Sequence, residues 1–256
     1  MNDLQITTLT LLRFESKNVF WMLSQMQLSL AGFRQIKGLR FFKLMGSGSK
    51  QGFSILPDWK SYALLCVWES EALAMDFFER APHFALFRAR ASALWTVFMQ
   101  NAKAHGQWSG QSPFADFQRY SGGLLAVITR ATIKWQYMAR FWMSVPKVSN
   151  DLQDHAGLIF SVGIGEYPLF MQATFSIWED RSFMQQYAYK SPLHSEVVKK
   201  TRALGWYKEE LFANFIPYKT LGSWKGSDPL SAFLSGSGND RLNAQADQPL
   251  QSKQGR

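Results

Sequence analysis

The sequence predicts an α+β protein built from two fused ferredoxin-like halves. Segments with strand and helix patterns follow one another in the order β-α-β-β-α-β, which is the ferredoxin-like order, and this order returns later in the chain. Trp68-Glu69 recurs as Trp178-Glu179, and Pro82 recurs as Pro192, both 110 positions later. Because the same spacing separates the two strand ends and the two helix breaks, the sequence indicates a duplicated unit.

The first half is expected at residues 1–105. Thr-rich and apolar runs indicate its strands, and apolar residues at helical spacing indicate its helices. The expected order is a strand at 5–15, a helix at 19–33, strands at 38–45 and 62–68 around a Gly/Ser-rich loop at 46–52, helices at 72–80 and from the break at Pro82 to Leu94, and a strand at 95–99.

A Gly/Ser/Pro-rich connector, residues 106–123, is expected to separate the halves. The second half, residues 124–224, repeats the pattern with strands at 124–133, 157–165, 169–178 and 211–216, a helix at 135–145 and a broken helix before the last strand. The tail at 225–256 is rich in Gly, Ser, Asp, Asn and Gln, and such a composition predicts disorder because it buries too little apolar surface.

Composition is typical of a globular protein with a ring-rich interior, since 46% of the residues are hydrophobic and 15% aromatic. The chain contains no run of about eighteen apolar residues, so we expect no membrane-spanning helix. Residues 1–5 lack the basic and apolar regions of a secretory signal, so we expect a cytoplasmic protein. The single cysteine, Cys66, lies in an apolar strand-like run, which predicts a buried, inert thiol.

The net charge of +9, from 28 Lys and Arg against 19 Asp and Glu, favours anionic partners. Acidic lipid head groups at a membrane surface and an acidic electron carrier both fit this charge. The basic residues are scattered, and no helix-turn-helix, zinc-finger or RNA-recognition signature accompanies them. We therefore expect no nucleic-acid partner.

The stretch from Trp178 to Trp206 centres on a predicted helix start. Ser191 can cap an orphan N–H and Pro192 suits the first helical position. His194 then falls in the first turn, where the helix dipole favours the neutral imidazole that can bind a metal. Counting by three and four places His194 on one face with the uncharged residues Val197, Val198 and Thr201. Such a face suits a flat cofactor, although a lone histidine is more often an ordinary hydrogen-bonded residue.

Strand alternation predicts a polar surface that faces His194. Ser161, Gly163 and Gly165 share one face of their strand, and Gln172 and Ser176 share one face of the next. Glycine inside a strand often marks the close approach of a ligand, but it also marks a β-bulge or a tight turn. We add Arg130 of the preceding strand as a third polar group, with a surface charge at a strand end as the alternative.

Other chemistries lack their signatures in this chain. Gly46-Ser47-Gly48 is not continued as a phosphate-binding loop, and Gly163-Ile164-Gly165 lacks the third glycine and the helix of a dinucleotide site. No serine occupies a Gly-x-Ser-x-Gly turn. The remaining histidines, His83, His105 and His155, are dispersed and form no pair with zinc-binding spacing.

Several separated segments, in order, resemble the spheroidene monooxygenase family of carotenoid biosynthesis. The resemblance covers roughly residues 7 to 224. The segments are Gly38-Leu39-Arg40-Phe41-Phe42-Lys43-Leu44 with Gly46-Ser47-Gly48, Arg88-Ala89-Arg90-Ala91-Ser92, Trp108-Ser109-Gly110-Gln111-Ser112-Pro113-Phe114, residues 125–132, Gly163-Ile164-Gly165-Glu166, Thr174-Phe175-Ser176-Ile177-Trp178, and Gly205-Trp206 with Glu209-Glu210-Leu211.

The resemblance implies a monooxygenase that adds a hydroxyl and then a keto group at the end of an acyclic carotenoid such as spheroidene. This family is similar to haem proteins of the dimeric α+β barrel type, in which a helical histidine ligates iron, and His194 fits that role. The resemblance does not place the other site residues. Helical spacing and strand alternation alone suggest Ser161, Gly163, Gly165, Val197, Val198 and Thr201 around such a haem, and strand alternation alone suggests Arg130, Gln172 and Ser176 as the catalytic polar groups.

The expected partners are an apolar carotenoid held in an aromatic-rich channel, reduced ferredoxin or a similar electron donor, and a peripheral contact with the cytoplasmic membrane face. Two alternatives stay open. One is a cofactor-free oxygenase of the same fold, and the other is a non-catalytic protein that binds a carotenoid or another lipid.

Overall fold

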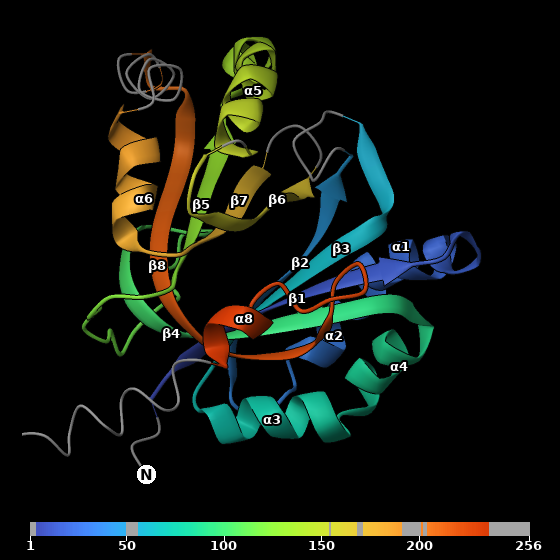
Figure 1. Cartoon of the computed structure of the whole chain (residues 1–256). Coiled ribbons are helices and arrows are strands. Elements are labelled where there is room, and N and C mark those ends of the chain that lie inside the picture. The colour runs from blue at the N-terminus through green and yellow to red at the C-terminus, as the bar shows by residue number, and fades with distance from the viewer. Residues whose placement is uncertain are drawn as a thin grey trace, which may run out of the picture.

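The computed structural model describes residues 4–49, 56–153, 155–167, 171–190, 201 and 204–235; the side chains of 144–151, 167, 189 and 190 also lie outside this description. Eight strands in the described residues form a closed barrel in the order β1-β3-β2-β6-β7-β5-β8-β4 (Figure 1). Every neighbouring pair around the barrel is antiparallel. The expected α+β class is therefore confirmed, with all strands in one sheet that closes on itself.

The first part of the chain contributes four strands and the helices between them. In order these are β1 (Ile6–Phe14), η1 (Ser16–Asn18), α1 (Val19–Leu28), α2 (Leu30–Phe33), β2 (Leu39–Gly48), β3 (Pro57–Trp68), α3 (Glu71–Arg80), α4 (Pro82–Arg90) and β4 (Ala91–Gly106). Ser70 caps α3 by accepting a hydrogen bond from the Leu73 N–H, and Pro82 opens α4 at a position where proline is favoured.

The second part repeats the alternation. It contains β5 (Leu125–Ile133), η2 (Trp135–Tyr137), α5 (Met138–Gln153), β6 (Leu158–Tyr167), β7 (Met171–Trp178), α6 (Arg181–Gln185), the π-helical segment η3 (Gln186–Lys190), β8 (Tyr207–Ser223) and α8 (Ser231–Leu234). In Figure 1, α3 and α4 lie on one side of the barrel, and α5 and α6 lie on the other.

The barrel interior is filled by side chains. Its core includes Trp95, Phe175 and Phe215, all fully buried, as expected for an eight-stranded barrel whose lumen is just wide enough for side chains. Trp108 and Phe114 of the connector are buried in the same core, and so is Leu230 from the turn before α8. The aromatic residues inside the barrel therefore serve packing, and the barrel interior is not the expected channel.

Three expected boundaries differ from the structure. The helix after Pro82 ends at Arg90 rather than Leu94, because residues from Ala91 onward pair with β1 and this pairing outweighs local helix preference. β8 is also much longer than the expected strand at 211–216. The chain stays ordered beyond 224 as far as Ser235, with the Asp228 carboxylate accepting hydrogen bonds from Trp95 Nε1 and Thr220 Oγ1, whereas residues 236–256 lie outside the described part.

Two further expectations concern the buried thiol and the membrane. Cys66 is fully buried, and burial raises the pKa of its thiol well above the usual value, as expected for an inert cysteine. Among the described helices, none combines the length and the apolar composition needed to cross a membrane.

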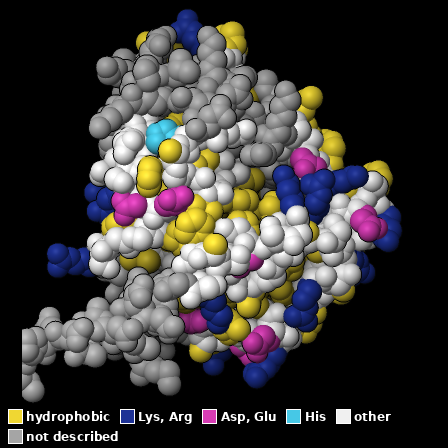
Figure 2. All heavy atoms as spheres, viewed as in Figure 1, with side chains coloured by type: hydrophobic (Ala, Val, Ile, Leu, Met, Phe, Trp, Pro, Cys, Tyr) yellow, Lys and Arg dark blue, Asp and Glu magenta, His cyan; other side chains and the backbone are white. Residues whose placement is uncertain are grey.

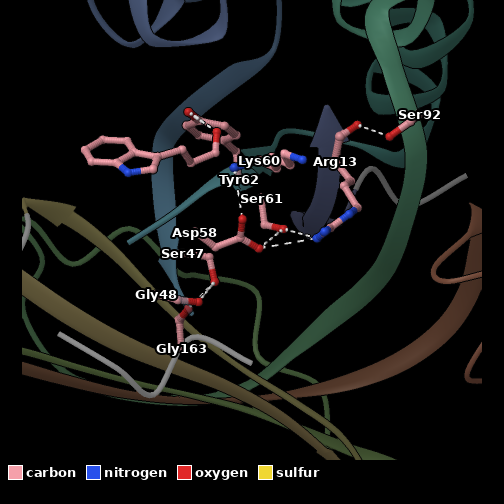
Figure 3. A network of polar contacts seen from close by, with 10 residues as sticks. Arg13, Ser47, Gly48, Asp58, Lys60, Ser61, Tyr62, Ser92 and Gly163 are labelled. Atoms are coloured by element: carbon pink, nitrogen blue, oxygen red, sulfur yellow. Dashed lines mark hydrogen bonds and ion pairs between the residues drawn. The ribbon is translucent and has the colours of Figure 1, made fainter. Parts of the chain in front are cut away.

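The barrel closes at a short seam between β2 and β6. Backbone pairing there joins Gly46 to Gly165 and Ser47 to Ile164. Ser47 Oγ adds a hydrogen bond of 2.9 Å to the carbonyl oxygen of Gly163 across the seam (Figure 3). The same close-up shows Asp58, near the start of β3, accepting hydrogen bonds from Arg13 and Ser61. Since the backbone ladder at the seam is short, side chains supply much of the closure.

A buried charge cluster of Lys43, Arg130, Glu166 and Glu209 joins this seam to the second part of the barrel. Lys43 Nζ lies 2.5 Å from Glu166 across the seam, and Trp108 Nε1 donates to Glu166 at 2.6 Å. The Arg130 guanidinium pairs with Glu209 and lies 3.5 Å from Glu166. The Arg130 side chain is 2% exposed and stacks over the Trp108 ring at 5.6 Å.

Glu209 is held in its charged form by this arrangement. Burial by itself raises the pKa of its carboxyl, but N–H groups of Gly110 and Ser109 and the guanidinium of Arg130 outweigh burial and lower the pKa below its usual value. Those N–H groups belong to the loop that carries Trp108 into the barrel. The cluster therefore fixes the connector as well as the seam.

Replacing Arg130 with methionine should destabilise the barrel, because Glu209 and Glu166 would lose the guanidinium inside a largely buried site. We expect the free energy of unfolding to fall by about 3 kcal/mol, as measured by chemical denaturation. Arg80→Met removes an exposed ion pair with Asp76 and should change the same quantity by less than about 0.5 kcal/mol. Equal effects of the two substitutions would contradict a closing role for the cluster.

Candidate functional site

The helical face predicted to carry the metal ligand falls mostly outside the described residues. This applies to His194, Val197 and Val198, whereas Thr201 is described and is 6% exposed. Before them, α6 runs directly into η3, so the chain is already helical up to Lys190. Within the described part of the chain, no group of three or more His, Cys, Asp or Glu residues has the arrangement of a metal site.

Strand pairing brings five of the predicted residues together on the outer face of the second part of the sheet. The β6–β7 ladder places them in adjacent rows. Ser161 lies opposite Ser176, Gly163 lies opposite Thr174, and Gly165 lies opposite Gln172. Because alternate residues of a strand point to opposite faces, these six positions share the face that points away from the barrel interior. The surface expected from alternation is therefore present. We call these six residues, together with Val127, Thr129 and Ala131 of the neighbouring strand β5, the small-residue floor.

The neighbouring strand β5 extends the floor with short side chains. Val127 lies opposite Ser176, Thr129 opposite Thr174 and Ala131 opposite Gln172. Val127, Thr129 and Thr174 remain partly exposed, while Ser161 and Ser176 are buried. The floor is thus accessible along its middle and closed at the end nearest Trp178, where Trp178 Nε1 donates to Ser176 Oγ at 3.0 Å.

Arg130 does not belong to this surface. It pairs with Ala173 on β7 and with Leu211 on β8, both of which face the barrel core. Its guanidinium lies in the buried charge cluster, on the opposite side of the sheet from Gln172 and Ser176. The expected grouping of Arg130 with these residues is therefore corrected: Arg130 serves barrel closure and does not face a group bound on the outer floor.

The corresponding face of the first part of the sheet is filled by large side chains. In the β2–β3 ladder, Phe42 lies opposite Cys66, Leu44 opposite Leu64, and Gly46 opposite Tyr62. These positions match Ser161–Ser176, Gly163–Thr174 and Gly165–Gln172 when Trp68 and Trp178 are aligned as the strand ends. Rings from the helices complete the filling, and Phe33, for example, stacks on Phe42 with centroids 5.1 Å apart.

This difference between the two faces identifies the second one as the candidate site. A sheet face and the helices that cover it normally meet through interlocking apolar side chains, as in the first part of the chain. On the small-residue floor the sheet contributes mostly Gly, Ser, Thr and Ala instead, with Val127 and Gln172 as its larger side chains. The arrangement suits a planar cofactor with one face against the floor.

Gly163 and Gly165 of the floor have different backbone surroundings. A Cβ on Gly165 would lie 2.7 Å from the carbonyl oxygen of Met171, and the ladder shifts register next to it. A side chain at Gly165 would therefore clash with the backbone of the next strand, beside a register shift. This agrees with the alternative given in the sequence analysis, a β-bulge or tight turn. Gly163 lies in the regular ladder, and its carbonyl accepts a hydrogen bond from Ser47, so no register shift explains this glycine.

The segment that leads to the predicted ligand helix is firmly anchored. The Asp180 side chain caps α6 by accepting from the Ser182 N–H at 2.8 Å, which lowers the pKa of its carboxyl. Tyr120 of the connector donates to Asp180 at 2.9 Å, and the Arg181 guanidinium lies 4.3 Å from the Tyr120 ring centroid. Tyr187 of η3 packs in one buried cluster with Trp178. The connector therefore also positions the start of α6.

Sequence reasoning missed the aromatic pair at the other end of the floor. Trp206 is 3% exposed and stacks on Tyr137 with centroids 6.1 Å apart and planes inclined by 20°. Its indole Nε1 is buried without a hydrogen-bond partner. Gly205-Trp206 appears among the segments that carry the family resemblance, but alternation and helical spacing assign it no role. An unpartnered donor beside the floor is consistent with a bound polar group.

Comparison with known proteins identifies relatives along most of the chain, although no family model matches it. A spheroidene monooxygenase of Cereibacter sphaeroides is 35% identical over 91% of this chain and 72% of its own length. A spheroidene monooxygenase of Rhodobacter capsulatus is 36% identical over 89% of this chain and 96% of its own length. A third, from Rubrivivax gelatinosus, is 32% identical over 74% of this chain and 73% of its own length.

Solved structures with a similar fold include aldoxime dehydratases. One superposes with a TM-score of 0.57 over 89% of this chain and 82% of that chain, at 11% identity. Another, in complex with butyraldoxime, gives a TM-score of 0.55 over 84% of this chain and 79% of that chain, at 12% identity. At these identities the likeness shows a shared fold.

Filling the floor should block a flat ligand while leaving the fold intact. Gly163→Leu introduces the residue found at the matching position of the first face, Leu44, and overpacking should weaken haem binding about tenfold or more in an absorbance titration. Ala89→Leu adds the same side chain at an exposed position of α4 and should leave the titration unchanged. Unaltered haem affinity in a folded Gly163→Leu protein would rule out the floor as the binding surface.

Proposed function

The chain belongs to the spheroidene monooxygenase family, and from that premise we propose that it adds a hydroxyl and then a keto group at the end of an acyclic carotenoid such as spheroidene, with haem as its cofactor. It is accordingly a monooxygenase, an oxidoreductase. The observation that carries the cofactor proposal is the contrast between the filled face of the first part and the small-residue floor of the second.

The proposed haem lies between the floor and the helical layer that follows α6. Ser161, Gly163 and Gly165 would lie beneath it, with Val197, Val198 and Thr201 on the helical side. His194 is the proposed iron ligand, because a first-turn histidine is kept neutral by the helix dipole. The fit is supported by the short side chains of the floor and by the unpartnered indole N–H of Trp206 at its end. Bound haem would supply the activation of dioxygen.

The residues of the chain would organise substrate and protons around that group. Gln172 and Ser176 face outward on the floor and would orient the reacting end of the polyene, while Arg130 is assigned to the barrel interior. Each hydroxylation consumes one dioxygen, two electrons and two protons and releases one water. A second hydroxylation at the same carbon gives a geminal diol, which loses water to become the ketone. The apolar polyene would lie outside the packed barrel, with its reacting end against the floor.

We also propose that the two parts of the chain are copies of one ferredoxin-like unit, residues 1–105 and 124–224, joined by the connector at 106–123. Support comes from the strand orders β4-β1-β3-β2 and β8-β5-β7-β6 within the barrel, which correspond position by position. The matching Trp68 and Trp178 each end the third strand of their unit. Duplication would explain how one copy keeps the packed face while the other binds a cofactor.

His194→Ala should abolish both cofactor binding and chemistry. The purified variant is expected to lose the Soret band, and an acyclic-carotenoid-producing host that carries it should accumulate unmodified pigment by mass analysis. His105→Ala removes an exposed histidine of β4 and should retain both. Assays with and without reduced ferredoxin test the proposed electron donor, since each turnover needs two electrons.

Three outcomes separate this proposal from its alternatives. Ketone formation by protein prepared without iron would indicate a cofactor-free oxygenase. Polyene that is bound but returned unmodified in the presence of dioxygen and reductant would indicate a carrier. An unchanged Soret band and product in His194→Ala would reject this histidine as the ligand while leaving the haem proposal intact.

We propose further that the enzyme meets its apolar substrate at an anionic membrane surface through the turn that begins α5. Trp135, Met143 and Leu204 are 77%, 70% and 45% exposed, and a hydrogen bond from the Lys134 N–H to the Trp206 carbonyl joins the first and last of these segments. Lys134 and Lys208 beside them are exposed and suit acidic head groups. Figure 2 shows apolar side chains in the middle of one face of the molecule, with groups of Lys and Arg nearer its edges.

Trp135→Ser combined with Met143→Ser should weaken sedimentation with phosphatidylglycerol vesicles about tenfold or more, since each lost apolar side chain forfeits about 1.5 kcal/mol or more of burial. Vesicles of phosphatidylcholine alone should bind the native protein less well than anionic ones. Phe20→Ser alters an apolar residue of α1 that is 84% exposed and should bind like the native protein. Loss of binding in Phe20→Ser alone would place the membrane contact on the first part of the chain.

A further inference from the structure

Two nine-residue segments share one residue pattern, and each continues the last strand of its part of the barrel. Both have glycine, tryptophan, glycine and proline at the same places, separated by 116 positions throughout, and both end in a large apolar residue. We call them latch 1, at the end of β4, and latch 2, at the end of β8. Latch 1 is Gly106-Gln107-Trp108-Ser109-Gly110-Gln111-Ser112-Pro113-Phe114, and latch 2 is Gly222-Ser223-Trp224-Lys225-Gly226-Ser227-Asp228-Pro229-Leu230.

The latches also share one backbone conformation. In latch 1 the tryptophan and the residue three positions later exchange backbone hydrogen bonds of 2.8 and 3.2 Å, and the two residues between them have φ of 55° and 73°. In latch 2 the same bonds measure 2.8 and 3.3 Å, and the same two residues have φ of 53° and 92°. Positive φ is uncommon for Ser109 and Lys225, which are the first of these two residues, so this agreement indicates equivalent sites in the fold.

The glycine that opens each latch lies where two backbones approach closely. A Cβ on Gly106 would lie 2.1 Å from the carbonyl oxygen of Glu210, and a Cβ on Gly222 would lie 2.2 Å from the carbonyl oxygen of Leu94. Leu94 and Glu210 are themselves 116 positions apart, so the two contacts are counterparts.

The β4–β8 ladder shows the same relation between the two parts of the chain. Gln100 lies opposite Ile216, and these residues are also 116 positions apart. Residues that pair with their own counterparts mark an approximate two-fold axis, as in an isologous interface. The latches are therefore related by the axis that relates β4 to β8.

Latch 1 joins the end of β4 to the second part of the barrel. Trp108 Nε1 donates to Glu166 of β6 at 2.6 Å, and two N–H groups of the turn donate to Glu209 of β8 at 3.1 and 2.7 Å. The buried Phe114 ring lies with its centroid 5.0 Å from that of Phe215. Latch 1 thus fixes one end of β6 through Glu166.

Latch 2 joins the end of β8 to β4 through one carboxylate. Asp228 accepts hydrogen bonds from Trp95 Nε1 at 2.9 Å, from the Leu230 N–H at 3.0 Å and from Thr220 Oγ1. Leu230 is fully buried in the barrel core. Trp95 in turn contacts Phe160 of β6, with ring centroids 5.0 Å apart. Latch 2 thus supports the other end of β6 through Trp95.

The strand that both latches support carries three residues of the small-residue floor. Only Ile164 and Gly165 of β6 pair with β2, so among the described strands most of β6 pairs with β7 alone. Phe160 precedes Ser161, the first floor residue of this strand, and Glu166 follows Gly165, the last. The supports therefore lie directly outside the two ends of the floor segment.

We propose that latch 1 and latch 2 are two copies of one closing segment and that together they hold β6, and with it the floor, from both ends. This inference goes beyond the proposed function and needs no bound cofactor. The duplicated units then extend through Phe114 and Leu230, and each ends in its own latch. The latches differ in their polar anchors, because latch 1 has Ser112 where latch 2 has Asp228.

The test follows hydrogen–deuterium exchange of the full chain by mass spectrometry. Asp228→Ser places in latch 2 the residue that latch 1 has at the same place, and three hydrogen bonds to the carboxylate are lost. Exchange should rise about fivefold or more in residues 158–163 and 224–235, and stay unchanged in α3 and α4. Trp108→Phe keeps a ring but removes the donor to Glu166, and it should raise exchange at the other end of β6, in residues 164–166.

Asp76→Ser provides the matched control, because it removes an exposed carboxylate of α3 that pairs with Arg80, and it should leave exchange in β6 unchanged. Faster exchange confined to residues 224–235 in Asp228→Ser would mean that latch 2 only anchors the chain beyond β8, which overturns the proposal. Equal acceleration in all strands would indicate a general loss of stability and would overturn it as well. Unchanged exchange of β6 in Trp108→Phe would remove the role given to latch 1.

Discussion

The closure of the barrel depends on the charges that meet across the seam between β2 and β6. The long β4–β8 ladder joins the two parts of the sheet on one side, whereas backbone pairing at the β2–β6 seam is short. Lys43, Glu166 and the hydroxyl of Ser47 therefore supply much of the closure at this seam. Buried ion pairs often contribute little net stability, because desolvation offsets their attraction. Their geometric demands are strict, however, and Glu166 must also accept from Trp108 while Arg130 pairs with Glu209. The cluster therefore fixes one register of β2 against β6 and one position of the connector, and the floor of the second part depends on both.

The outer faces of the two parts of the sheet have the same strand order but differ in side-chain size. This difference is why only the second face is a candidate site. Where the first face presents Phe42, Leu44 and Leu64, the second presents Ser161, Gly163 and Thr174. The first face gains stability from ring packing with its helices, including Phe33 and Phe77. On the second face, Val127 of the floor packs in one cluster with Leu152 and Tyr187 from the helical side. Further stability comes from the capped start of α6, the contact of Tyr120 with Asp180, and the shared barrel core. A cofactor bound only to the folded state would add to this stability, so binding and stability are expected to be linked on this side.

Much of this arrangement could be predicted from the sequence, because alternation along a strand fixes which residues share a face. Ser161 with Gly163 and Gln172 with Ser176 were grouped correctly in this way. Alternation does not fix which face of one strand joins which face of the next, and this is why Arg130 was assigned to the wrong side of the sheet. Only the pairing of Arg130 with Ala173 resolves the choice. The burial of Trp108, Phe114 and Leu230 was also beyond local patterns, since a Gly/Ser-rich connector and a polar tail give no sign that single apolar residues within them enter the barrel.

The packed barrel also limits where an elongated apolar substrate can lie. The barrel core is packed with large side chains and offers no path for a polyene. The strands contribute Trp95, Phe175 and Phe215, the connector contributes Trp108 and Phe114, and the chain before α8 contributes Leu230. The remaining apolar route on the second part of the chain follows the outer floor and the helices above it, where Trp135 and Leu204 surface next to Trp206. A substrate that enters from a membrane at Trp135 would then meet the floor at the end where Trp206 stacks on Tyr137. Substrate entry would thus depend on this turn of the chain, and a change at Gly205 that displaced the turn would disturb it.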